Sequence, residues 1–149
     1  MPGTMSNTLR RTLLFIAVLA VAGIGVSSLS LYHHFGTSKT TYCDIGENFN
    51  CDIVNRSSYS SILGVPVALI GILGYATLFG LAAFQREKAD TPALLLTAST
   101  AGLGFALYLT YIEKFVLATW CILCLSSLTL IFLITVLSSF AVASSRRQA

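Results

Sequence analysis

The sequence predicts an all-α membrane protein, a four-transmembrane-helix bundle with a long outer loop between its first two helices. Hydrophobic residues make up 55% of the 149 residues and charged residues only 10%, whereas a soluble domain carries about 25% charged residues. The mean hydropathy of +0.80 points the same way. All Lys, Arg, Asp and Glu residues lie outside four long apolar runs. We therefore interpret residues 1–149 as a single integral membrane domain.

The first apolar run covers residues 12–32 and follows Arg10 and Arg11. Its length matches the roughly 20 residues that a helix needs to cross a bilayer. A cleaved signal peptide also has a basic start and an apolar core, but that core usually spans only about 7–15 residues. We therefore expect a retained transmembrane helix.

A polar segment at residues 36–63 follows and forms the predicted outer loop. It contains Cys43 and Cys51, each followed by the same Asp-Ile dipeptide. The serine-rich end of the loop, from Ser57 to Leu63, is predicted to form a short helix on the membrane surface.

The second and third apolar runs cover residues 64–84 and 93–112 and are joined by a short charged turn. Pro66 lies near the start of the second run, where a missing N–H costs least. The third run carries small residues at four-residue intervals, which are Ala98, Gly102 and Ala106. Such a stripe allows another helix to approach closely, so we expect a packing surface there.

The fourth apolar run covers residues 121–143 and begins with Cys121-Ile-Leu-Cys124 directly after Trp120, a typical interface anchor. Two cysteines three residues apart lie on one helix face, and Cys-x-x-Cys pairs form reversible disulfides whose thiolate is favoured at a helix N-terminus. Cys121 is expected nearer to water, with Cys124 one turn deeper. Tyr75, Tyr108 and Tyr111 fit packing or interface positions equally well, so the sequence alone does not identify residues that would line a binding pocket between the helices.

The distribution of basic residues predicts the orientation. The two termini and the turn between the second and third runs hold six Lys and Arg residues, and the other two loops hold three. The positive-inside rule therefore places both termini in the cytoplasm and both cysteine pairs on the opposite, oxidising side. Because the C-terminal tail has no obvious retrieval signal, we expect a multi-pass protein of the bacterial inner (cell) membrane.

Three interpretations of the four cysteines compete. Structural disulfides explain the motif at Cys121 and Cys124 poorly, since a bridge within one helical turn closes a minimal loop. A zinc site is disfavoured because the spacing between Cys43 and Cys51 is wide for a ligand pair, so no metal is expected. A redox relay, with a shuttle pair in the loop and a fixed pair at the membrane, agrees with both the spacing and the topology.

The relay interpretation gives each pair a task. Cys121 would exchange disulfides with a loop cysteine, and Cys124 would meet the oxidant that the bilayer supplies. A quinone is the lipid-soluble two-electron oxidant of membranes. Asp44 and Asp52 disfavour thiolates beside them, so the loop disulfide is expected to be the weaker oxidant, and electrons would run from the loop to the Cys-x-x-Cys pair.

In the order and spacing of these motifs, nearly the whole chain resembles bacterial disulfide-forming members of the vitamin K epoxide reductase family. The matching motifs are Cys43-x7-Cys51, Ser57-Ser58-Tyr59, Leu63-Gly64-Val65-Pro66, Gly71 and Trp120-Cys121-x-x-Cys124. The resemblance implies a four-helix bundle around a quinone (ubiquinone or menaquinone) and a quinone-reducing thiol–disulfide oxidoreductase that supports disulfide bond formation.

The resemblance also implies residue roles. Cys43 would receive electrons from a periplasmic or extracytoplasmic thioredoxin-like (DsbA-type) partner, and Cys51 would pair with Cys121. Cys124 would face the quinone, with Ser57 close to the quinone and the active cysteines.

One position departs from part of the family. Mammalian members carry a tyrosine that helps to hold the vitamin K ring, where this chain has Leu128, which favours simple quinone reduction over vitamin K epoxide chemistry. Vitamin K (epoxide) reduction by the same relay and a non-enzymatic scaffold with structural disulfides remain the alternatives. The DsbB type of disulfide-forming membrane protein has the two cysteine pairs in the reverse order.

Overall fold

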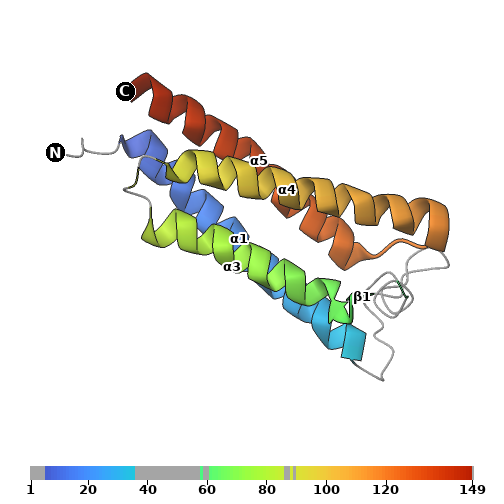
Figure 1. The fold of residues 1–149 in the computed structure, drawn as a ribbon. Coiled ribbons are helices and arrows are strands. Elements are labelled where there is room, and N and C mark those ends of the chain that lie inside the picture. Colours follow the sequence, from blue (N-terminus) through green and yellow to red (C-terminus); the bar gives the residue numbers. More distant parts are fainter. Residues whose placement is uncertain (1–5, 36–57, 59–60, 86–87, 89, 149) are drawn as a thin grey trace.

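The computed structural model describes residues 6–35, 58, 61–85, 88 and 90–148. Its main elements are the helices α1 (Asn7–Phe35), α3 (Val67–Phe84), α4 (Thr91–Ile112) and α5 (Ile122–Gln148). Each is long and apolar enough to cross a membrane, α4 together with the turn that follows it. The predicted all-α, four-span fold class is therefore confirmed. Both ends of the chain lie at one end of the bundle, and the β1 hairpin lies at the other (Figure 1).

The helices extend beyond the apolar runs at the end of the bundle that holds the two termini. Helix α1 begins at Asn7, and α5 continues through Arg146 and Arg147. Ser6 explains the start of α1, because its hydroxyl accepts a hydrogen bond from the Leu9 N–H at 3.2 Å, as an N-cap does. Hydropathy marks the part of a helix that crosses the bilayer, whereas backbone hydrogen bonding and capping determine where the helix ends.

A β-hairpin precedes α3, where the sequence predicted first a surface helix and then the start of a span. Strand β1 (Ser61–Ile62) pairs antiparallel with β2 (Val65–Pro66). The two turn residues, Leu63 and Gly64, have φ values of 53° and 83°. Two consecutive residues with positive φ are typical of a tight two-residue hairpin turn.

The prediction of a surface helix is therefore wrong for residues 61–63. Ser58 lies in a short 3-10 turn, whereas Ser57, Tyr59 and Ser60 lie outside the described residues. The second span begins at Val67 instead of Gly64 because Pro66 has the extended ψ of 134° and occupies the N-cap position.

A short π-helix, η2 (Glu113–Leu117), continues directly from α4, so the connection between the third and fourth apolar runs is partly helical. Ala118 ends it in the left-handed conformation with a φ of 49°. The carbonyl of Glu113 accepts hydrogen bonds from the N–H groups of Ala118 and Thr119. This closed turn brings the chain back toward the bundle just before α5.

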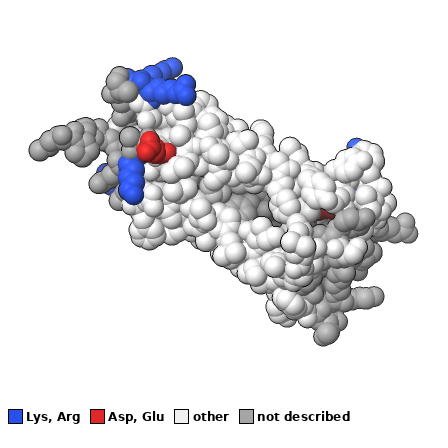
Figure 2. All heavy atoms as spheres, in the orientation of Figure 1, with Lys and Arg blue, Asp and Glu red and all other residues white. Residues whose placement is uncertain are grey.

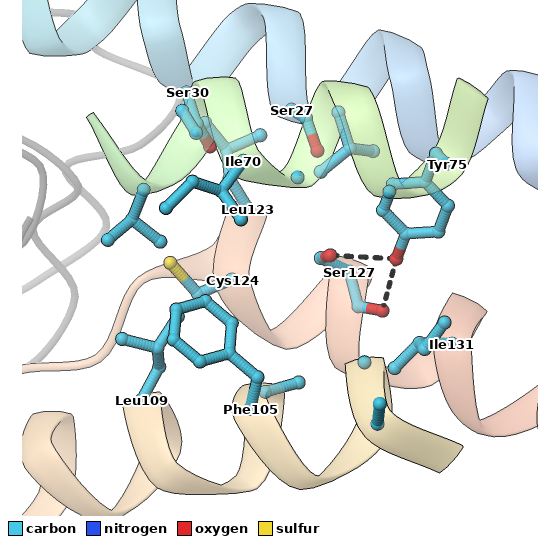
Figure 3. Close-up of a pocket in the computed structure, with 18 of the residues that line it drawn as sticks. Ser27, Ser30, Ile70, Tyr75, Phe105, Leu109, Leu123, Cys124, Ser127 and Ile131 are labelled. Atoms are coloured by element: carbon cyan, nitrogen blue, oxygen red, sulfur yellow. Dashed lines mark hydrogen bonds between the residues drawn. The ribbon is translucent and has the colours of Figure 1, made fainter. Parts of the chain in front are cut away.

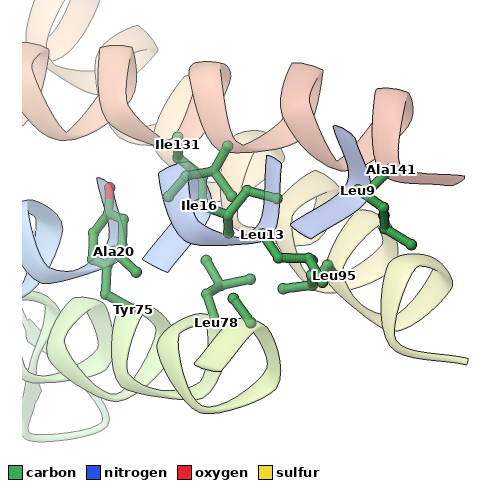
Figure 4. Close-up of a cluster of buried hydrophobic side chains, with 11 residues drawn as sticks. Leu9, Leu13, Ile16, Ala20, Tyr75, Leu78, Leu95, Ile131 and Ala141 are labelled. Carbon is green, nitrogen blue, oxygen red and sulfur yellow. The ribbon is translucent and has the colours of Figure 1, made fainter. Parts of the chain in front are cut away.

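The helices pack in the pairs α1–α3, α4–α5 and α1–α5, and α3 contacts α4 less extensively. Their buried core runs along the bundle (Figure 4). The buried apolar side chains of this cluster are Leu9, Leu13, Ile16, Ala20, Tyr75, Leu78, Ala82, Leu95, Ile131, Ile134 and Ala141. Because lipid tails are as apolar as these side chains, close packing and not water exclusion holds such helices together.

Glycines allow the close approaches. A Cβ at Gly102 would lie 3.2 Å from Ile131 of α5, which confirms the predicted packing surface at this position. A Cβ at Gly71 would lie 2.8 Å from the hydroxyl oxygen of Ser27 of α1. The charged side chains gather toward the ends of the molecule and leave an uncharged middle band (Figure 2), as a bilayer requires.

Candidate functional site

A cavity of about 430 Å³ lies inside the bundle, with walls from all four helices and η2. It lies between α3 and α4, the neighbouring pair with the least contact. Most of its wall is apolar, with Ile70 of α3 and Phe105 and Leu109 of α4 among its side chains (Figure 3). Its polar groups come from a few positions on α1, α3, α5 and η2.

The Cys-x-x-Cys pair lies at the start of α5. The Cys121 carbonyl accepts the first helical hydrogen bond, from the Leu125 N–H at 3.0 Å, so Cys121 holds the N-cap position. Cys124 follows one turn later, and its thiol points into the cavity (Figure 3). The structure therefore puts one cysteine of the pair in the cavity wall.

The solvent exposure of the two cysteines is the reverse of what the sequence predicted. Cys121 was expected nearer to water, but its exposed fraction is 0%, whereas Cys124 is partly exposed. Cys121 forms a buried cluster with Leu123, and Leu117 of η2 and Val26 of α1 pack against this cluster. Distance from the helix start is therefore a poor guide to solvent access here. The other predicted site residues, Cys43, Cys51 and Ser57, lie outside the described residues.

Tyr75 supplies the cavity with a hydroxyl from α3. It donates a hydrogen bond to the Ser127 carbonyl oxygen at 2.9 Å and lies 2.8 Å from the Ser127 hydroxyl oxygen. Its ring packs directly on Gly23 of α1, where a Cβ would come within 2.3 Å of the ring. Tyr75 is therefore held rigidly between three helices, with its polar atom at the cavity wall.

The other two tyrosines considered from sequence, Tyr108 and Tyr111, are both more than half exposed. The sequence did not separate Tyr75 from them. A usable signal was its position four residues after Gly71, which places both residues on the same face of α3. Leu128 is not part of the cavity wall, and the tyrosine that lines the cavity, Tyr75, comes from α3.

Glu113 is the functional candidate that the sequence reasoning missed. It is 1% exposed and lines the cavity together with Cys124. Its Oε2 accepts a hydrogen bond from the Cys121 N–H at 3.1 Å, and the Cys124 thiol also interacts with its side chain. Its position directly after an apolar run indicated a loop residue, whereas η2 turns it inward.

The cavity suits a small, mostly apolar ring that carries polar oxygens. Its volume lies within the range of about 300–1,000 Å³ that is typical of ligand sites, and it combines an apolar wall with a few polar groups, as such sites do. The polar groups include the Tyr75–Ser127 pair and the Cys124–Glu113 pair, and Cys124 brings a thiol that is capable of thiol–disulfide exchange. A quinone ring fits this combination, because it is planar and apolar apart from its carbonyl oxygens.

Comparison with known protein families gives an independent result. The family model described as the vitamin K epoxide reductase family matches residues 14–139 of the chain. The match covers most of α1 and α5, all of α3 and α4, and both cysteine pairs.

Proposed function

Since the chain belongs to the vitamin K epoxide reductase family, whose members are membrane oxidoreductases linked to quinones, we propose that it reoxidises a thioredoxin-like protein at the expense of a membrane quinone. The product of this reaction is a protein partner with its disulfide restored. The proposed role is therefore to support disulfide bond formation on the outer side of a bacterial inner membrane.

The position of Cys124 carries the proposal. Its thiol faces an apolar cavity inside the bundle, one turn from Cys121 at the start of the same helix. A dithiol that can close to a disulfide in contact with a lipid-soluble oxidant is what quinone reduction requires. A structural disulfide has no such need for a cavity.

The chain's own residues divide the work as follows. Cys43 takes electrons from the partner, Cys51 exchanges with Cys121, and Cys124 contacts the electron acceptor, with Ser57 close to that site. Cys121 lies at a helix N-terminus, where the helix dipole stabilises its thiolate as a leaving or attacking group. A bound quinone, ubiquinone or menaquinone, supplies the capacity to take up two electrons and two protons.

Residues of the cavity wall favour simple quinone reduction over vitamin K epoxide reduction. Tyr75 already uses its hydroxyl in hydrogen bonds to Ser127. Leu128, at the position of the mammalian tyrosine, has no hydroxyl to offer and lies outside the cavity wall. The proposed quinone reduction relies on the apolar wall and on the Cys124 thiol that faces the cavity, and it needs no hydroxyl at the position of Leu128.

The test uses the purified full-length protein in detergent, mixed with reduced thioredoxin and either a short-chain ubiquinone or a menaquinone analogue. We expect a loss of quinone absorbance and oxidation of the thioredoxin, and loss of both with Cys124→Ala. The absence of turnover with either quinone, together with unchanged stability of the Cys124→Ala variant, would instead indicate a non-enzymatic scaffold.

Cys43→Ala is the matched control for the relay. It removes the contact with the partner and leaves the fixed pair intact, so turnover with thioredoxin should stop while turnover with dithiothreitol persists. If Cys43→Ala keeps full activity with thioredoxin, the loop pair is not the entry point for electrons.

A further inference from the structure

Glu113 is a buried carboxylate at the point where the cavity meets the Cys-x-x-Cys pair. It lies on η2, is 1% exposed and forms part of the cavity wall with Cys124. A carboxylate in such a place is costly unless its oxygens are hydrogen-bonded. The role of the Glu113 side chain can therefore be inferred from the contacts of its two carboxylate oxygens.

The two carboxylate oxygens of Glu113 differ in their contacts. Oε2 accepts the Cys121 N–H at 3.1 Å, which fixes the start of α5. Oε1 is buried and has no hydrogen-bond partner of normal geometry among the described residues. The Cys124 thiol interacts with this same side chain.

A purely structural role, in which Glu113 connects η2 to the start of α5, explains only part of this arrangement. The backbone of Glu113 already closes the turn, because its carbonyl accepts from Ala118 and Thr119. One amide-accepting oxygen would complete the connection to Cys121, and a glutamine would supply it without the cost of a buried charge. That role does not explain the second oxygen, Oε1, which is buried without a hydrogen-bond partner of normal geometry among the described residues.

We propose that Glu113 is the proton acceptor for the Cys124 thiol when the Cys121–Cys124 disulfide forms, an inference that rests on the proposed function. Closing the disulfide removes two protons and two electrons from the two thiols, and the quinone takes up both. Glu113 accepts the proton from Cys124 Sγ and becomes a neutral carboxylic acid, while the sulfur keeps the electron pair. It returns to the carboxylate when that proton moves on to the reduced acceptor.

The surroundings make a protein-borne acceptor necessary. The cavity wall around the Cys124 thiol is mostly apolar, so water is a poor proton acceptor at this position. A base positioned within hydrogen-bonding reach of the proton contributes about 100- to 10,000-fold to the rate of such a step. Glu113 is the carboxylate that the described part of the chain places beside Cys124.

Two substitutions separate proton transfer from structure. Glu113→Gln has the same shape and keeps an acceptor for the Cys121 N–H, but it does not take up a proton. Glu113→Asp keeps the carboxylate but is one methylene shorter. If Glu113 accepts the proton, Asp outperforms Gln, whereas a purely structural role ranks Gln above Asp.

The first measurement is a single turnover of pre-reduced, full-length protein with a short-chain ubiquinone. We expect Glu113→Gln to slow quinone reduction by about 100-fold or more and Glu113→Asp to retain a clearly larger rate. Lys114→Gln is the matched control, since Lys114 is the adjacent exposed charge on η2, and it should leave the rate unchanged.

The second measurement needs no quinone. In a chain with Cys43, Cys51 and Cys121 changed to Ala, we follow alkylation of Cys124 by iodoacetamide. Alkylation needs the same deprotonation of Cys124, so Glu113→Gln should slow it severalfold while Glu113→Asp stays closer to the parent rate. A loosened structure would speed both variants, and the shorter Asp more.

The outcomes distinguish the inference from the proposed function. If the reduced wild-type protein reduces no quinone, the proposed function fails, whatever the alkylation rates. If the wild type is active and Glu113→Gln lies within about threefold of it, or exceeds Glu113→Asp, the proton-acceptor role is wrong. Slow quinone reduction combined with slow alkylation in Glu113→Gln, and higher rates of both reactions in Glu113→Asp, support it.

Discussion

Tyr75 carries both a packing role and a polar role within one side chain. Its ring is 5% exposed and rests on Gly23, and its hydroxyl bridges to Ser127 on α5. Hydrogen bonds between membrane helices contribute about 0.6 kcal/mol on average and up to roughly 1.7 kcal/mol. The hydroxyl and the ring can therefore be tested separately.

We expect Tyr75→Phe to lower the free energy of unfolding by about 0.5–1.5 kcal/mol, since it removes the hydroxyl and keeps the ring. Gly23→Ala should cost more, about 1–3 kcal/mol, because the new methyl group overlaps the Tyr75 ring. Both are measured by denaturation in detergent. Thr97→Val is the control, since its exposed hydroxyl bonds only to its own helix, and a loss as large as that of Tyr75→Phe would contradict the bridging role.

Sequence reasoning at this scale found the reactive residues but not their surroundings. The Cys-x-x-Cys motif has a recognisable spacing, so Cys121 and Cys124 could be named. Their relative burial could not, because it depends on how η2 folds back over Cys121. Glu113 was missed for the same reason: a charge at the end of an apolar run indicates a loop, and only the π-helical turn directs it inward.

At the scale of the elements, the hairpin before α3 contains a strained residue. Leu63 is 100% exposed and has a φ of 53°, which costs a residue with a Cβ about 1–2 kcal/mol. No packing is lost if its side chain is removed.

We therefore predict that Leu63→Gly raises the free energy of unfolding by about 0.5–1 kcal/mol, after subtraction of the extra entropy that glycine gives the unfolded chain. Gly64→Ala should lower it, because its φ of 83° also disfavours a side chain. Chemical denaturation of both variants checks the pair, and equal effects would show that the turn differs from the one described.

The α4–α5 contact gives a second prediction at this scale. Gly102→Leu should destabilise the protein by about 1–3 kcal/mol, because its side chain has to displace Ile131. Gly104→Leu, two residues along the same helix, should be nearly neutral, since nothing lies within 4 Å of a Cβ there. Thermal denaturation of the two variants compares them directly, and similar losses would contradict the described packing.

The elements themselves could largely be predicted from the sequence. Four charge-free runs indicated four spans because a buried charge in lipid is costly, and the stripe at Gly102 indicated a close helix contact. The hairpin and η2 were not predicted. Each is only a few residues long and depends on backbone conformations, such as that of Leu63, which side-chain polarity does not report.

For the whole molecule, the charge distribution predicts which side each end faces, and this prediction can be tested in cells. In a chain with its native cysteines changed to Ser, Leu63→Cys should react with a membrane-impermeant maleimide in intact spheroplasts. Lys88→Cys and Arg147→Cys should react only after lysis, because their end of the bundle is expected to face the cytoplasm. Labelling of Lys88→Cys before lysis would show that the orientation is the reverse of the predicted one.

The placement of both chain ends at one end of the bundle restricts how this protein can be tethered to another (Figure 1). A soluble redox domain joined by a flexible linker to the end of α5 would face the compartment opposite to the hairpin end and the Cys-x-x-Cys pair. Lengthening the linker would not help, because the barrier is the bilayer and not distance. A working fusion would need one additional apolar helix of about 20 residues between α5 and the attached domain.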